Sequence, residues 1–183
     1  MSEEFDRLTD QEKHRIIALP YRVGLWMSTL DGGGGDVADE LESMAMIHAI
    51  EHLARAQQDD FAAYICRQTL AARADWLKWS ANFTVVPDEC TQAISDLAPF
   101  LSRADLDGYK GAVFSVATAV ARAYREGVPR NRLNNTSLIT QMLNHIHDNG
   151  AQGDQTVNVS PHERAALDRL AAALEYTPVS EQV

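Results

Sequence analysis

The sequence is poor in cysteine, in positive charge and in long hydrophobic runs, and each shortage excludes a class of protein. Its 2 cysteines, Cys66 and Cys90, form no CxxC pair and lie in apolar segments, so we expect two reduced, partly buried thiols rather than a disulfide. With 16 basic against 26 acidic residues the net charge is -10, which disfavours nucleic-acid binding through a basic patch. No apolar run reaches the roughly 18 residues of a membrane span, so we expect no membrane insertion.

What remains is the composition of an ordinary globular protein. The chain has 183 residues, of which 45% are hydrophobic and 23% charged, enough to bury a sizeable core in one medium domain. The acidic start Ser2-Glu3-Glu4 is not followed by the apolar segment of a signal peptide. Together with the reduced thiols, this start predicts a cytoplasmic location.

Apolar residues recur at spacings of three and four along most of the chain, which is the pattern of amphipathic helices. Thr9 with Glu12, and Ser160 with Glu163, are two capping boxes that mark helix starts. Pro20 removes a backbone donor, so the first helix should kink or restart there. The expected helices cover residues 10–30, 37–56, 60–79, 87–101, 104–126, 135–147 and 160–174, with a polar loop at 148–158.

The predicted fold is therefore all-α, a single-domain bundle of about seven or eight helices over residues 9–175. Residues 1–8 are expected to form a flexible N-terminus and residues 176–183 a C-terminal tail. The only strand-like run, residues 83–86, has no partner strand. In the helix expected over 60–79, the spacing predicts that these side chains are buried: Phe61, Tyr64, Ile65, Leu70, Trp76 and Leu77.

The best candidate site is an acidic corner around four consecutive glycines, residues 32–35. The glycines stop the preceding helix after Asp31, and Asp36 can cap the next one. Asp39 and Glu40 follow within that helix, so these four acids form a candidate site for a divalent cation such as Ca²⁺. An EF-hand does not fit, because positions 3 and 5 of its loop would be Gly33 and Gly35, which have no side-chain ligand. The alternative is a solvated turn whose acids interact only with the helix dipole.

A second candidate is the HxxEH string formed by His48, Glu51 and His52. Helical spacing places both histidines on one face, as two zinc ligands require, with Glu51 as a possible base and Glu126 as a distant third ligand. This pattern predicts a small metal-dependent hydrolase. The alternative is a polar helix face, because the fold that carries this string is a large α/β domain that a short helical chain cannot build.

Several short motifs resemble the start of the tellurite-resistance TerB group of proteins. They are Leu8-Thr9-Asp10-x-Glu12-Lys13, Pro20-x-x-Val23, Leu30-Asp31-Gly32 and Asp39-Glu40. Val159-Ser160-Pro161-His162-Glu163, with Leu167 and Leu170, is similar to the second such helix start of that family. The resemblance covers about residues 8–56 and 105–175.

The resemblance implies an all-helical fold with an internal pseudo-repeat and a non-enzymatic stress-response or scaffold function. It also implies that acidic loops bind divalent cations, with Asp31, Asp36 and Glu40 as the first site and Glu126 and Glu163 as the corresponding acids of the second half. A protein partner or a homodimer fits such a role. The chain departs from the family in its four glycines, in the missing second Asp-Gly and in an apparent insertion at 131–158.

Overall fold

The computed structural model describes residues 5–30, 35–57, 60–123 and 159–178, and these form a helical bundle without a strand. The all-α prediction is confirmed. The α-helices are α2 (Asp10–Ser28), α3 (Gly35–Ala54), α4 (Phe61–Ala71), α5 (Trp76–Trp79), α6 (Val86–Leu97), α7 (Arg103–Ala121) and α9 (Pro161–Ala173). Two 3-10 helices, η1 (Arg73–Asp75) and η2 (Phe83–Val85), flank α5.

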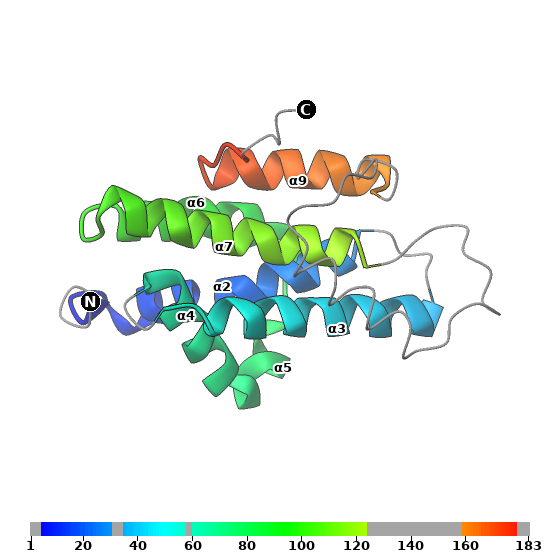
Figure 1. Ribbon diagram of the computed structural model, residues 1–183, viewed down its shortest axis with the longest axis horizontal. Helices are drawn as coiled ribbons and strands as arrows, with labels where there is room; N and C mark the ends of the chain where they lie inside the picture. The colour runs from blue at the N-terminus through cyan, green and yellow to red at the C-terminus, as the bar shows by residue number, and fades with distance from the viewer. Residues whose placement is uncertain (1–4, 31–34, 58–59, 124–158, 179–183) are drawn as a thin grey trace.

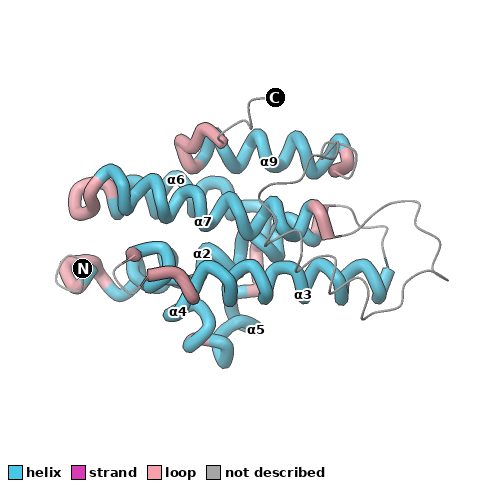
Figure 2. The backbone as a smooth tube through the Cα atoms, in the orientation of Figure 1, coloured by secondary structure: helices cyan, strands magenta, loops and turns pink. Residues whose placement is uncertain are grey.

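The helices stack in layers (Figure 1). The helices α2 and α3 contact each other, and both pack against α7. Helix α9 covers α6 and α7 on the outside, α4 packs against α2, α3 and α7, and α5 lies on the side of the bundle away from α9. The tube in Figure 2 shows that the axes of α3, α7 and α9 lie roughly along one common direction. Helix α2 is therefore central, because it contacts helices from several layers.

Local capping signals define where helices begin. The backbone N–H of Glu12 donates to Thr9 Oγ1 at 3.3 Å and the N–H of Thr9 donates to Glu12 Oε2 at 2.6 Å. Ser160 and Glu163 form the same reciprocal pair at the start of α9. Both predicted capping boxes are confirmed, since each satisfies two backbone donors that a helix start leaves open.

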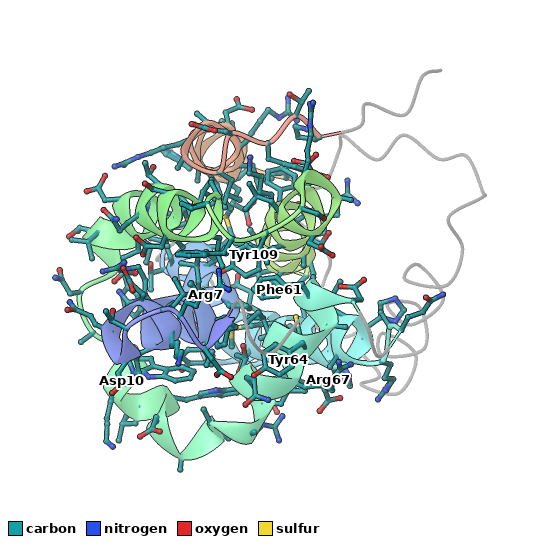
Figure 3. All side chains as sticks on the ribbon, turned by 90° about the vertical axis from the view of Figure 1, so that its left-hand side faces the viewer. Arg7, Asp10, Phe61, Tyr64, Arg67 and Tyr109 are labelled. Atoms are coloured by element: carbon teal, nitrogen blue, oxygen red, sulfur yellow. The ribbon has the colours of Figure 1, made fainter. Side chains whose placement is uncertain are left out.

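The core lies where α2, α3, α4 and α7 meet. Figure 3 shows Phe61 of α4 beside Tyr109 of α7 in the interior, with ring centroids 5.9 Å apart. Gly24 allows α2 to approach α3 closely, because a Cβ added there would lie 2.6 Å from Met46 Cγ. Fully buried side chains of the four helices include Ile16, Leu19, Val23, Met27, Ile50, Phe61, Ile65, Tyr109, Val113 and Val116.

The prediction of a single helix over residues 60–79 is wrong. Helix α4 ends at Ala71, the 3-10 turn η1 follows, and α5 is a separate helix of 4 residues. Leu77, expected in the core, is 86% exposed. A 3-10 turn has about three residues per turn and changes the phase of the following helix, so spacing counted from Leu70 no longer applies at Leu77.

The other boundaries lie close to expectation, with three differences. Helix α2 continues through Pro20 without a restart. Asp36, expected as a cap, lies inside α3, which begins at Gly35. Helix α7 ends at Ala121, while Glu126, the expected helix 135–147 and the expected loop 148–158 lie outside the described residues.

Residues next to both ends of the described bundle also pack on it. Phe5 and Leu8, before the first capping box, are buried, and Tyr176 packs on Phe114 with ring centroids 5.3 Å apart.

Candidate functional site

The start of α3 carries three of the four acids of the acidic corner. Positions 36, 39 and 40 are three and four residues apart on one helix, so they share one of its faces. The side chains of Asp39 and Glu40 are exposed, and no cationic side chain in the described part of the chain pairs with them. Asp31 and the side chain of Asp36 lie outside what is described. Exposed carboxylates in this arrangement can offer several oxygens to a hard cation.

Glu42 is the exception among the acids that begin α3. Its side chain is buried, with the residue only 7% exposed, whereas Asp39 and Glu40 face the surface. Glu42 lies more than half a turn from Glu40 but only three residues from Asp39, so its burial depends on what packs against α3 there and not on spacing alone. Of the acidic corner, the described and exposed side chains are therefore those of Asp39 and Glu40.

The HxxEH string forms a surface network of charges. Glu51 accepts contacts from His48 Nδ1 at 3.8 Å, Arg55 Nη2 at 3.9 Å and Arg73 Nη2 at 3.4 Å. Two guanidinium groups thus neutralise the carboxylate that the hydrolase hypothesis needs as a base. Among the described residues no group of three His, Cys, Asp or Glu side chains could hold a metal, and Glu126 lies outside them. This geometry favours the polar-face interpretation.

The two cysteines are free and buried, as predicted for reduced thiols. Burial raises the pKa of the Cys66 thiol to about 12 and raises that of Cys90 further. Since the thiolate is the reactive form, neither group is a nucleophile near neutral pH. Both cysteines therefore act as small apolar side chains of the core.

Arg22 binds the backbone of the segment that follows α4, a role that sequence reasoning did not predict. It lies on α2 and is only 9% exposed. Its guanidinium donates to the carbonyl oxygens of Trp79, of Ala81 at 2.9 Å and of Asn82 at 3.3 Å, and its Nε donates to Glu89 Oε2 at 2.7 Å. The sequence feature that could have indicated this role is a single arginine inside an apolar run, between Tyr21 and Val23.

We call residues 73–85, comprising η1, α5 and η2, the α5 arm. Besides the arginine contacts, two tryptophans attach this arm to the bundle. The Trp76 ring stacks on Tyr21 at 4.5 Å between centroids, and its Nε1 donates to the carbonyl of Thr69 at 3.0 Å. The Nε1 of Trp79 donates to His14 Nε2 at 2.8 Å. Side chains of α2 and a backbone carbonyl of α4 thus hold the arm.

Comparisons with known proteins name no family for this arrangement. No family model matches the chain, and neither the curated proteins nor the solved structures contain a match. None of the helices in the described ranges has the length and apolar character needed to cross a bilayer. The TerB-like assignment therefore stays a prediction from the sequence motifs.

Proposed function

We propose that this chain is a non-enzymatic TerB-like module, a stress-response or scaffold protein that binds a divalent cation at the acidic corner. The supporting observation is the exposure of Asp39 and Glu40 at the start of α3, directly after the glycine run and without a cationic partner among the described residues. Like charges this close repel each other, and a divalent cation relieves that repulsion while accepting their oxygens.

Two effects keep the expected affinity modest. Ordering the glycine-rich loop costs roughly 1–2 kcal/mol per residue in backbone entropy. The N-terminal end of the α3 dipole is positive and opposes a cation placed there. We therefore expect a cation that exchanges readily and is lost during purification. A cytoplasmic location and a protein partner, or a second copy of the chain, complete the proposal.

The test is the melting temperature measured against millimolar Ca²⁺, Mg²⁺ and Mn²⁺. A cation that binds the native state raises stability with the logarithm of its concentration above the dissociation constant. The double variants Asp31→Asn/Asp36→Asn and Asp39→Asn/Glu40→Gln should each lose this rise. Both should also be more stable than the wild type without added cation, because the repulsion is removed.

Asp88→Asn is the matched control, since Asp88 is an exposed acid in the first turn of another helix, α6. It should keep the full response to cation. If wild type and both double variants respond equally, the acids interact only with the helix dipole. Stoichiometric zinc in the purified protein that is lost in His48→Ala would instead favour the metal-dependent hydrolase.

A further inference from the structure

The contact between Trp79 and His14 depends on the protonation state of the histidine. The Trp79 indole N–H donates to His14 Nε2 at 2.8 Å, with the two rings nearly perpendicular at 85°. A ring nitrogen accepts a hydrogen bond only when it carries no proton, so His14 is the neutral tautomer with its proton on Nδ1. His14 is exposed to water while Trp79 is only 3% exposed.

The other tryptophan of α5 provides a comparison within the same four-residue helix. The Trp76 indole donates to the backbone carbonyl of Thr69 at 3.0 Å, an acceptor that does not titrate. The two indoles therefore make hydrogen bonds of similar length to acceptors of different kinds. Only the bond of Trp79 is sensitive to pH in the range where histidine changes charge.

The other charged groups around His14 keep their charge in that range. On the α5 arm, Asp75 lies near the imidazole, and a 2.6 Å hydrogen bond from Lys78 lowers the pKa of its carboxyl. The same bond raises the pKa of Lys78. Arg22, which holds the Trp79 carbonyl, is always protonated and is paired with Glu89 of α6.

The charged neighbours of His14 on α2 are engaged elsewhere or exposed. Lys13 contacts Asp6, and Arg15 forms an ion pair with Asp96 of α6. Asp10, one turn before His14, is exposed. Lysine and arginine stay protonated and carboxylates stay ionised where imidazole titrates, so His14 is the group next to Trp79 that changes state.

We infer that the hydrogen bond from Trp79 to His14 is a pH-sensitive latch between the α5 arm and α2. When His14 takes a proton from water, Nε2 becomes an N–H donor in addition to Nδ1. The imidazolium N–H and the indole N–H then face each other, so the buried indole N–H of Trp79 has no acceptor. One of the rings must then turn away. Arg22 continues to hold the backbone of the arm at Trp79, Ala81 and Asn82, so the release is local. This latch goes beyond the proposed cation binding.

The test follows the indole N–H signals of the full chain by ¹⁵N NMR while the pH is lowered from about 8 to about 5, across the range of histidine. The Trp79 signal should shift together with the imidazole C–H signals of His14. Its protection against hydrogen exchange should fall about tenfold relative to that of Trp76, as expected when one hydrogen bond is lost. Trp76 serves as the internal reference.

Three variants separate the latch from a general effect of acid. His14→Gln keeps an acceptor that does not titrate, so Trp79 should stay protected at low pH. His14→Leu removes the acceptor, so Trp79 should be unprotected already at high pH, with helical circular dichroism confirming the fold. His52→Gln, at an exposed histidine of α3, should respond as the wild type does. A Trp79 signal that ignores the titration of His14, or an unchanged pH response in His14→Gln, would overturn the inference.

Discussion

Around Pro20 in α2 and in the α5 arm, side chains of other elements donate hydrogen bonds to backbone carbonyls, but the donors differ in kind. In α2, Pro20 has no N–H to bond Ile16, and the Tyr109 hydroxyl donates to the Ile16 carbonyl at 3.0 Å instead. Thr69 Oγ1 donates to the next carbonyl, that of Ile17, at 2.6 Å. In the α5 arm, the single guanidinium of Arg22 binds three carbonyls.

The difference follows from how far each region lies from water. Tyr109 is buried between helices, and burial raises the pKa of its hydroxyl well above the ordinary value, so the group stays protonated and remains a donor. A neutral hydroxyl is cheap to bury, whereas a charge needs a partner. The α5 arm lies nearer the surface, where Glu89 can balance the charge of Arg22. The core therefore uses neutral hydroxyl donors, those of Tyr109 and Thr69, whereas the α5 arm uses one charged guanidinium for three carbonyls.

The largest expected effect is that of Arg22→Met, which keeps much of the apolar stem and removes the charge. It should cost about 3–5 kcal/mol in the free energy of unfolding, because it strands a partly buried carboxylate and three carbonyls. Chemical denaturation measures this loss. Arg103→Met is the control, since Arg103 pairs with Asp107 on the exposed surface and should cost less than about 1 kcal/mol. If Arg22→Met and Arg103→Met lowered the free energy of unfolding equally, the contacts of Arg22 to the α5 arm would contribute no more than an exposed ion pair.

Tyr109→Phe should have the next largest effect, a loss of about 1–3 kcal/mol, because the buried Ile16 carbonyl loses its donor. Pro20→Ala restores a backbone N–H four residues after Ile16. In the Pro20→Ala background, Tyr109→Phe should therefore cost clearly less, and a double-mutant cycle measures the coupling. If Tyr109→Phe costs the same in both backgrounds, the hydroxyl does not compensate for the proline.

Thr69→Val should have the smallest effect, a loss of about 1 kcal/mol, because it removes, at almost constant volume, the hydroxyl that donates to Ile17 of α2 as well as to Ile65 of its own helix. Thr118→Val is the matched control. Among the described residues, the Thr118 hydroxyl donates to the carbonyl one turn earlier in its own helix, that of Phe114, at 2.9 Å. The control should be close to neutral in the same denaturation experiment, and a larger loss in the control than in Thr69→Val would contradict the comparison.

The helix starts and the all-α class were predictable because their signals are local. A capping box joins residues three apart, and amphipathic spacing repeats within two turns. The same reasoning failed at Leu77, because no local signal marked the 3-10 turn that separates α4 from α5. It placed Asp39 and Glu40 correctly on the second helix, but it could not tell that Glu42, two residues later, is buried. That distinction depends on what packs against each face of α3.

Within the described residues, the sequence by itself determined most of the helical segments and placed Asp39 and Glu40 on the second long helix. Tertiary structure decided which side chains complete the backbone hydrogen bonds. Arg22 binds the Trp79 carbonyl 57 residues away in the sequence, and Tyr109 binds the Ile16 carbonyl 93 residues away. No periodicity or spacing relates such residues. They meet because burying the apolar faces of α2, α4 and α7 brings the helices together. A buried carbonyl left without a donor at such a contact would destabilise the fold, so a polar side chain from a neighbouring element supplies the donor.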